Sequence, residues 1–483
     1  MRVFSGSVSS LVIRVERALI QGKINHALVM IHDFVERIIT EPICVAQVFS
    51  SHILDELCIK IGNQNLENLI DTPVNPWANS MKKPIALYIV SRLQRSGGHS
   101  RLIQDFIRSQ PAKNHFILST EIGGPSDKDY IKSIFAVDNN VNFLYADNVS
   151  FASRLSWLQS MLITVQPEHV YLFNHHQDSV AVAALVPQLK LKGSFFHHGD
   201  HHLCLGVHMN YLNHVDLHPM GFHYCRDELG IDNLYMPLTF EDKKYIEYST
   251  EFVNGGYITT ATAARSNKVE IPYYVSYVDM VPKIMKATGG KHIHIGRLTP
   301  WALSRIYKQL RKHGINKDRF VYLQWTPSVW QSLQKYNVDV YIASFPYGAG
   351  LTLIEAMGAG VPVIMHQHMY SRVLSGLELA YPEAFCWADP GDLLTHLETV
   401  TVERLASEKI LSRKQYESFH RSDILKTFLK DPVSIQQSVP QLSKEFRPRY
   451  DEWAAWVESQ FTLSKLIYRS AYRAWRKVRR LVG

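Results

Sequence analysis

The chain has 483 residues, of which 46% are hydrophobic and 20% charged, and its formal net charge at pH 7 is +8. This length predicts two large domains with extensions, and the composition excludes an intrinsically disordered chain. The excess of positive charge favours an anionic partner: a nucleotide, a phospholipid surface or nucleic acid.

The cysteines and the apolar segments indicate the cellular compartment in which the protein is found. The five cysteines are scattered, and none forms a C-x-x-C pair, so we expect neither a disulfide framework nor a cysteine-based zinc site. Arg14 and Glu16 interrupt the first apolar run, which argues against a signal peptide. No segment approaches the roughly 20 apolar residues that span a bilayer. We therefore expect a cytoplasmic protein, free or bound peripherally to the inner face of the membrane.

Residues 1–80 are expected to form a helical N-terminal cap. The segment 9–39 repeats apolar residues at spacings of three and four, which is the pattern of amphipathic helices. The Pro and Asn residues of 71–76 then indicate a linker.

Residues 81–245 predict a first domain of alternating strands and helices, with helical segments such as 100–110 and 152–165. Its expected strands are continuous apolar runs, the character of strands buried on both faces of a parallel sheet. These runs cover 84–91, 115–120, 141–146, 169–174 and 193–198.

Residues 246–425 predict a second domain of the same kind, and residues 426–483 predict C-terminal helices. The strands expected in the second domain cover 256–263, 292–296, 319–324, 338–344 and 361–366. Strands that alternate with helices form βαβ units. The predicted fold class is therefore α/β, with two doubly wound, Rossmann-like domains.

The last stretch, 460–483, is basic and aromatic. After Glu458 it contains Lys and Arg but no acidic residue, and aromatic and leucine residues interleave with the bases. Such a helix can lie on an anionic membrane, each cation adding about 1 kcal/mol of attraction. The alternative is a solvated terminal helix that packs on the protein by its aromatic face.

The segment SFPYGAGLTLIEAMGAGVPVIMH, residues 344–366, carries the strongest motif. A strand runs into a glycine-rich loop that opens a helix. Helix N-termini expose unpaired N–H groups with partial positive charge, and glycine lets a phosphate approach closely. The candidates for cradling a nucleotide diphosphate are Gly348, Gly350, Leu351 and Thr352. The alternative is a tight turn in which glycine serves packing alone.

The same segment resembles the donor-binding signature of GT-B glycosyltransferases, especially the large retaining family that includes bacterial lipopolysaccharide and exopolysaccharide sugar transferases. Glu355 matches the second Glu of that signature, and AMGAGVPVI matches the residues after that Glu. The resemblance implies two Rossmann-like domains facing a cleft, and a role for Glu355 in binding the donor's ribose. Tyr347 stands where the family has its first Glu. Because residues 371–373 also resemble O-GlcNAc transferase, an inverting enzyme, the stereochemical outcome stays open.

The resemblance implies further donor-binding residues. Arg265 and Lys268 take the positions of two cations that hold the diphosphate, and cations beside phosphates stabilise a leaving group without a metal. Gln324 and Trp325 lie where the nucleobase docks, and Gly97 and Gly98 lie near the donor phosphates. The alternatives are a solvated charge pair for Arg265 and Lys268, and a core position for Trp325.

Histidines crowd the ends of two expected strands, in FNHHQD (173–178) and FFHHGDHHLCLG (195–206). Because sites collect at the carboxyl ends of parallel strands, we expect both segments at one edge of the sheet. We interpret His198, Asp200 and His201 as catalytic, with a His or Asp acting as general base towards an acceptor hydroxyl. The alternatives are a zinc or iron site, and polar residues that only bind loop backbone.

These features together predict a metal-independent glycosyltransferase of the hexosyltransferase type. It would transfer a sugar from a UDP- or GDP-linked donor to a glycan or lipid-linked glycan in cell-surface polysaccharide biosynthesis, such as that of lipopolysaccharide. We expect no cofactor, no metal and no nucleic-acid partner. The alternatives are a metal-dependent hydrolase that uses the His197–His202 cluster, and a non-catalytic peripheral binding protein on a degenerate transferase fold.

Overall fold

The computed structural model describes residues 8–41, 44, 46–69, 83–94, 98–135, 140–147, 149–243, 254–348, 350–442, 445–467, 470, 471 and 474. Two compact units make up the chain. The first unit contains Met1–Asp242 and Tyr416–Gln441, and the second contains Lys243–Gln415 and Leu442–Gly483.

The first unit is built on a parallel sheet of seven strands in the order β3-β2-β1-β4-β5-β6-β7. The five strands expected from the sequence are confirmed. Two short strands, β6 and β7, extend the sheet beyond β5. The bounds are β1 Ile85–Val90, β2 Asn114–Ser119, β3 Val141–Tyr145, β4 His169–Phe173, β5 Gly193–His197, β6 Asn213–Asp216 and β7 Asn233–Tyr235.

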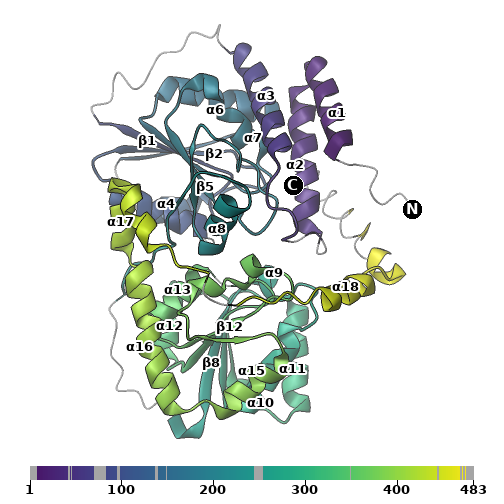
Figure 1. Ribbon diagram of the computed structural model, residues 1–483, viewed down its shortest axis with the longest axis vertical. Coiled ribbons are helices and arrows are strands. Elements are labelled where there is room, and N and C mark those ends of the chain that lie inside the picture. Colours follow the sequence, from purple (N-terminus) through teal and green to yellow (C-terminus); the bar gives the residue numbers. More distant parts are fainter. Residues whose placement is uncertain are drawn as a thin grey trace. The chain divides into compact units, whose positions relative to one another are not determined.

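The helices of the first unit cover both faces of this sheet (Figure 1). On one face, Leu28 and Cys58 of the N-terminal helices share a hydrophobic core with Ile89 and Leu172 of the sheet. On the other face, the ring of Phe106 packs edge-on against aromatic strand residues. The bounds are α1 Val8–Ile20, α2 Ile24–Thr40, α3 His52–Glu67, α4 Gly98–Ser109, α5 Lys128–Ile134, α6 Phe151–Val165, α7 Ser179–Ala184, α8 Pro219–Asp227 and α17 Ser422–Lys430.

The second unit contains a parallel sheet of six strands in the order β10-β9-β8-β11-β12-β13. The five strands expected from the sequence are confirmed here too, and β13 is an additional edge strand. The bounds are β8 Ile258–Ala263, β9 Gly289–Ile295, β10 Phe320–Leu323, β11 Val340–Ile342, β12 Val363–His366 and β13 Phe385–Trp387.

The helices of the second unit follow its strands in the βαβ pattern. Residues of α10, α11 and α15 share one hydrophobic core with strand residues such as Ile342. The bounds are α9 Ser266–Val269, α10 Tyr277–Thr288, α11 Pro300–Lys312, α12 Val329–Lys335, α13 Leu351–Gly358, α14 Arg372–Ser375, α15 Pro390–Thr399, α16 Val402–Phe419 and α18 Tyr450–Ser459. None of the described helices is long and apolar enough to cross a bilayer.

Each sheet has one place where the order of its strands reverses. In the first unit the chain builds β1, β2 and β3 outwards and then returns to place β4 beside β1. In the second unit it builds β8, β9 and β10 and then returns to place β11 beside β8. In doubly wound sheets, ligands bind beyond the carboxyl ends of the strands at such a switch point. These two places are therefore the first positions to inspect for a functional site.

Candidate functional site

The switch point of the second unit brings together two segments that the sequence singled out. Arg265 and Lys268 follow β8, and the glycine-rich loop follows β11, so both segments leave the sheet at the same edge. The Nζ of Lys268 donates to the carbonyl oxygen of Gly348 at 2.9 Å. This hydrogen bond ties the two loops to each other and holds an ammonium group at the switch point.

Lys268 is half-buried, and burial lowers the pKa of its ammonium group. A cation that has already lost part of its water costs less to bring into contact with an anion. Arg265 is exposed at the start of α9. Arg297 follows β9 and is exposed as well.

The helix α13 begins at the same edge, with Gly350 as its N-cap. Leu351 and Thr352 are its first two residues, and an α-helix provides no acceptor for the N–H groups of its first turn. Both residues are half-buried. The Thr352 hydroxyl is fixed by Tyr341, whose Oη donates to it at 3.1 Å. The start of α13 thus offers N–H groups and a partial positive charge close to Lys268.

Gly348 allows the glycine-rich loop to pack closely against α14. Its N–H donates to the carbonyl oxygen of Leu374 at 2.9 Å. A Cβ built on this residue would stand 2.7 Å from that same oxygen. This position therefore requires glycine because the loop passes closely over α14. Its own N–H group is used inside the protein, and the amides available to a ligand belong to the start of α13.

Glu355 lies on α13 and is buried. Its Oε2 accepts hydrogen bonds from the Ser328 hydroxyl at 3.2 Å and from the Trp330 amide at 3.1 Å. The carboxylate thus binds the N-terminus of α12, where the helix dipole favours a negative charge. The predicted role in binding a ribose remains a prediction, and the structure adds a contact that fixes α12 to α13.

Gln324 and Trp325 follow β10 at the same edge of the sheet. Both are exposed, and half of the Trp325 side chain, 50%, is accessible to solvent. The core position weighed for Trp325 is therefore wrong. An exposed indole suits stacking against a planar ligand. Tyr347, at the position of the family's first Glu, is half-buried, and burial raises its pKa.

The switch point of the first unit is organised by a buried carboxylate, Asp178. Its Oδ2 accepts hydrogen bonds from the Ser91 and Thr120 hydroxyls, each at 2.6 Å. Its Oδ1 accepts from the Ala181 amide at 2.9 Å and so caps α7. The carboxylate fixes the ends of β1, β2 and β4 to one another, which makes this edge of the sheet rigid.

Asp200 is the centre of the histidine-rich segment. It is buried, and its Oδ2 lies 2.7 Å from Nδ1 of His218, while its Oδ1 lies 3.3 Å from Nδ1 of His201. Burial opposes ionisation of this carboxyl, but His218 and His201 hold its pKa well below the usual range. The carboxylate therefore stays negative and orients two imidazoles.

His201 and His198 differ in their surroundings. The side chain of His201 is 37% exposed. The ring of His198 packs at 4.0 Å from that of His99, measured between centroids, and burial lowers the pKa of His198 to about 3. At neutral pH His198 is an uncharged, weakly basic imidazole. Of the three residues predicted to be catalytic, His201 is the imidazole that combines a carboxylate partner with access to solvent.

Further imidazoles lie beside His198 and His201. His99 lies on α4, and His175 and His176 follow β4. The rings of His176 and His201 lie 5.1 Å apart. Burial lowers the pKa of His99 and His176 well below the ordinary value, so these rings are neutral. Gly98 begins α4 as expected, and Gly97 lies outside the described residues.

Comparisons with known proteins bear on this architecture. No protein-family model and no curated protein matches the sequence. Solved structures do match. The Anabaena protein Alr3699/HepE in complex with UDP has a TM-score of 0.55 at 10% identity, covering 72% of this chain and 99% of that chain. A glycosyltransferase from Rickettsia africae ESF-5 has a TM-score of 0.54 at 11% identity, covering 75% of this chain and 100% of that chain. The chain has the GT-B fold.

The GT-B fold confirms the predicted fold class of two doubly wound α/β domains. A third solved structure, the lipopolysaccharide outer core galactosyltransferase WaaB in its apo form, agrees with it. Its TM-score is 0.51 at 16% identity, covering 72% of this chain and 99% of that chain. At these identities the likeness shows the fold alone.

Sequence reasoning missed two residues at the edge of the first unit, His99 and His218. His218 directly precedes Pro219, the first residue of α8, and follows β6. A histidine between a strand and a proline-initiated helix was a usable signal, but β6 itself was not recognised.

The metal site considered for the His197–His202 segment has a different composition in the structure. Among the described residues, the group whose ligand atoms lie close enough to hold a metal consists of His197, His214, Asp216 and Cys225. His197 is its only member from the 197–202 segment.

Proposed function

We propose that the chain is a glycosyltransferase that moves a sugar from a nucleotide-sugar donor to a glycan or lipid-linked glycan acceptor of cell-surface polysaccharide biosynthesis. The observation that carries this proposal is the switch point of the second unit, where Lys268 is fixed on the loop that leads into α13. A partly dehydrated cation beside a helix N-terminus suits a diphosphate. Anabaena HepE, which shares the fold, was determined with UDP and with UDP-glucose.

In the proposed donor site, the amides of Leu351 and Thr352 and the ammonium of Lys268 bind the diphosphate. The same groups stabilise the negative charge that develops on the leaving diphosphate, so the transfer needs no metal at this site. Arg265 adds a second cation, and the exposed Trp325 stacks on the base. The sugar is a hexose and the base is uracil or guanine in this proposal.

The first unit supplies the base for the acceptor. His201 accepts the proton of the acceptor hydroxyl, and Asp200 orients its imidazole and stabilises the imidazolium that forms. His218 holds the other oxygen of Asp200 and so keeps the carboxylate in place. A positioned base of this kind contributes about 10²–10⁴-fold to the rate.

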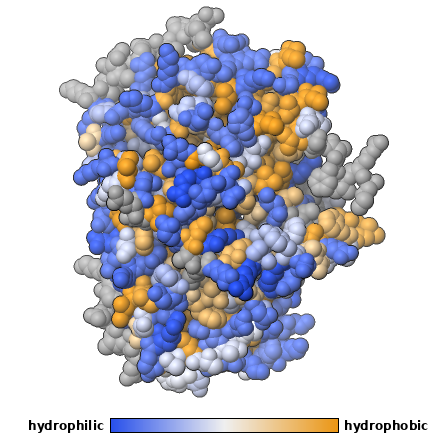
Figure 2. All heavy atoms as spheres, viewed as in Figure 1, coloured by the Kyte–Doolittle hydropathy of each residue, from blue (hydrophilic) through white to orange (hydrophobic). Residues whose placement is uncertain are grey.

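The C-terminal segment is proposed to contact an anionic membrane surface, where a lipid-linked acceptor would be found. Beyond α18, Phe461, Leu463, Leu466 and Ile467 are exposed. Figure 2 shows hydrophobic side chains at the surface over this end of the chain. Residues 468, 469, 472, 473 and 475–483 lie outside the described residues. Deletion of 460–483 should abolish co-sedimentation with anionic vesicles, and unchanged co-sedimentation would contradict this part of the proposal.

The test of the proposed function uses the full chain and a panel of nucleotide-sugars. Thermal unfolding is measured with UDP-, GDP- and ADP-sugars, because a ligand that binds only the folded state raises the midpoint. The donor that raises it is then incubated with the chain, and released nucleoside diphosphate is measured with and without lipid-linked glycan. Stabilisation by a nucleotide-sugar and acceptor-dependent release support the proposal. The absence of stabilisation by every donor would contradict it.

A further inference from the structure

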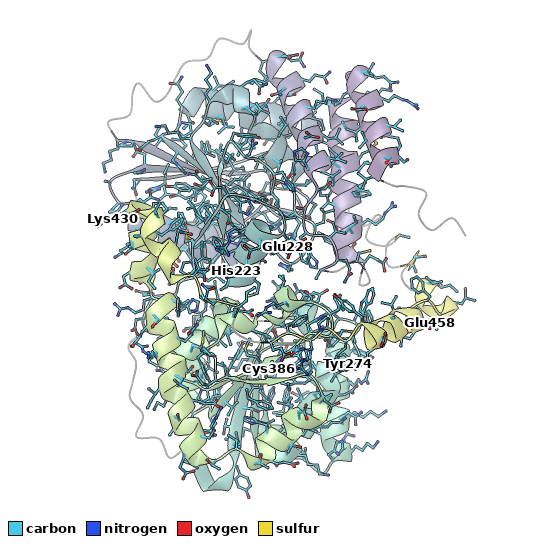
Figure 3. The ribbon with its side chains drawn as sticks, in the orientation of Figure 1. His223, Glu228, Tyr274, Cys386, Lys430 and Glu458 are labelled. Atoms are coloured by element: carbon cyan, nitrogen blue, oxygen red, sulfur yellow. The ribbon has the colours of Figure 1, made fainter. Side chains whose placement is uncertain are left out.

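Four buried side chains meet where α8 packs on the first sheet. His197 ends β5, His214 and Asp216 belong to β6, and Cys225 lies on α8 between His223 and Glu228, two residues labelled in Figure 3. The strand register pairs His197 with Asp216, and His214 is two residues before Asp216, so their side chains share one face of the sheet. All four residues are buried, with at most 4% of any of them exposed.

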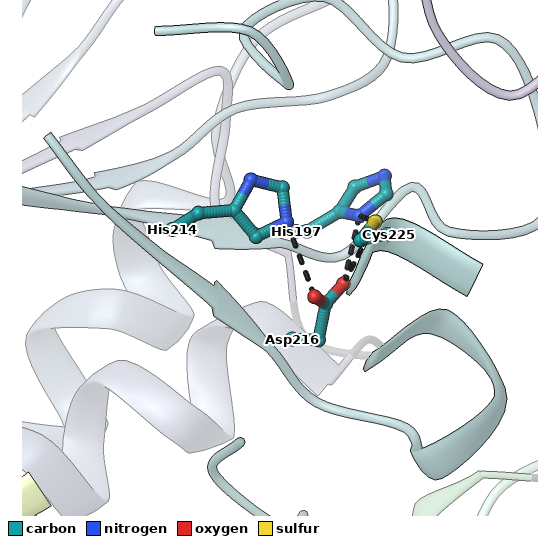
Figure 4. A group of neighbouring side chains, drawn as sticks. All are labelled: His197, His214, Asp216 and Cys225. Atoms are coloured by element: carbon teal, nitrogen blue, oxygen red, sulfur yellow. Dashed lines mark hydrogen bonds and ion pairs between the residues drawn. The ribbon is translucent and has the colours of Figure 1, made fainter. Parts of the chain in front are cut away.

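The ligand-type atoms of these four residues converge (Figure 4). All of them lie within 4.8 Å of one another. Asp216 Oδ1 is 2.9 Å from His197 Nδ1, and Asp216 Oδ2 is 3.2 Å from His214 Nε2. Cys225 Sγ is 3.5 Å from His197 Nδ1 and 3.6 Å from Asp216 Oδ1. In a tetrahedral zinc site, metal–ligand bonds of about 2.0–2.3 Å place the ligand atoms roughly 3.3–3.8 Å apart.

His214 directs its Nε2 atom towards the other members of the group. Its Nδ1 lies 3.2 Å from the carbonyl oxygen of Val207, which can only accept, so Nδ1 carries the proton. With Nδ1 occupied in this way, Nε2 is the nitrogen of His214 that can bind a metal ion. This Nε2 is buried without a hydrogen-bond partner among the described residues, and it faces the Asp216 carboxylate. A buried carboxylate needs a positive charge beside it, and a metal ion bound to this nitrogen and to the carboxylate would supply that charge.

We propose that His197, His214, Asp216 and Cys225 bind a zinc ion. Two imidazole nitrogens, one carboxylate oxygen and one thiolate sulfur are zinc ligands, and four protein ligands complete a tetrahedral shell. Because the shell is closed and buried, the ion is structural and takes no part in binding a donor or activating water.

His214 and Asp216 have the supporting contacts that zinc ligands use, whereas Nε2 of His197 is buried without a hydrogen-bond partner among the described residues. Histidines that bind a metal through one nitrogen donate the other N–H to a carbonyl or carboxylate, as His214 does to Val207. The carboxylate ligand is held as well, because the Asn233 side-chain amide donates to Asp216 Oδ2 at 2.6 Å. The same amide nitrogen donates to the Phe222 carbonyl of α8 at 2.9 Å, so β6, β7 and α8 are already tied together around the group.

The zinc ion joins the elements that carry the proposed base. His197 directly precedes the loop with Asp200 and His201, and Asp216 lies two residues before His218. The ion would therefore hold the two segments that form the contact between Asp200 and His218. This consequence rests on the proposed function, whereas the zinc site does not, because metal content is measured without any transferase assay.

The test is the zinc content of the full chain. The protein is produced with zinc, dialysed against metal-free buffer and analysed by inductively coupled plasma mass spectrometry. We expect about one zinc per chain, retained on dialysis because structural zinc binds tightly. His214→Gln and Cys225→Ser should each lose the zinc. Cys386→Ser is the matched control, because Cys386 belongs to β13 of the second unit and is not one of the four proposed ligands, and it should keep the zinc.

A cobalt-substituted form covers the case in which the variants fail to fold. Zinc is removed from the wild-type chain with a chelator, and cobalt is added in its place. Intense tetrahedral bands together with a thiolate-to-cobalt charge-transfer band support the four ligands. Wild-type protein without bound zinc overturns the proposal. Equal zinc content in folded Cys225→Ser, or cobalt binding without the thiolate band, does so as well.

Discussion

The two sheets have the same winding but carry different chemistry at their switch points. In the second unit, the loops at the reversal between β8 and β11 carry cations, glycines and the start of a helix. In the first unit, the loops that follow β1, β4 and β5 carry imidazoles and the buried carboxylates of Asp178 and Asp200. One edge is electropositive and suited to an anion, and the other is suited to accepting a proton.

Topology therefore selects where a site forms, whereas the loop residues select what it does. Lys268 and the amides of α13 attract negative charge. Asp200 orients His201 and His218, and burial lowers the pKa of the neighbouring His99 and His176, which stay neutral. Substitutions at the edge in the second unit should therefore change donor affinity, and substitutions at the edge in the first unit should change turnover.

The largest effect is expected from Asp200→Asn. The amide removes the negative charge that orients His201 and stabilises its protonated form. Turnover should fall by about 10²–10⁴-fold, the contribution of a positioned general base, with donor affinity unchanged. Initial rates of acceptor-dependent release of nucleoside diphosphate, together with calorimetric donor titrations, separate the two quantities.

Asp129→Asn is the matched control for that variant, since Asp129 is an exposed residue of α5 in the same unit. It should turn over like the wild type. An Asp200→Asn protein that keeps wild-type turnover would remove the proposed base, and one that lost donor binding would break the comparison between the two edges.

The next largest effect is expected from Lys268→Ala. Loss of a partly buried cation should weaken nucleoside diphosphate binding by roughly 10–100-fold, as hydrogen bonds to charged groups contribute about 1.5–3 kcal/mol. Isothermal titration of the full chain measures this change. Lys291→Ala, at an exposed position near the start of β9, is the control and should bind normally. Equal affinity in the two variants would contradict the donor site.

A smaller effect is expected from substitutions of Glu355. Two variants distinguish its contribution to stability from a contribution to donor binding. Glu355→Ala removes the acceptor for the Ser328 hydroxyl and the Trp330 amide, so the free energy of unfolding should fall by about 1–3 kcal/mol. Glu355→Gln keeps an acceptor oxygen and should lose less stability. If Glu355 also binds the ribose, both variants should have a lower affinity for the donor, which calorimetric titration would measure. Wild-type affinity in folded Glu355→Gln would leave the residue with its structural role alone.

Much of the fold was predictable because its central strands are long apolar runs, such as β1 and β4, buried on both faces. The strands that escaped prediction are short: β6 reads NHVD, β7 reads NLY and β13 reads FCW. Each of them gains its place by pairing with the preceding strand of its sheet, β6 with β5, β7 with β6 and β13 with β12, which no local pattern reveals. The predicted donor residues were found because a motif keeps them together in sequence. The contact of Cys225 with His197 joins residues 28 positions apart, and folding alone brings them together.

Hydrogen–deuterium exchange with and without a bound nucleoside diphosphate tests whether the start of α13 and Lys268 bind the diphosphate. UDP, GDP and ADP are compared on the full chain, and exchange is followed for the one that binds most tightly. We expect slower exchange for the peptides that contain Leu351, Thr352 and Lys268, and unchanged exchange for the peptide that contains Asp200 and His201. Protection confined to the histidine-rich edge, or no protection at the start of α13 while the nucleotide is bound, would contradict this expectation.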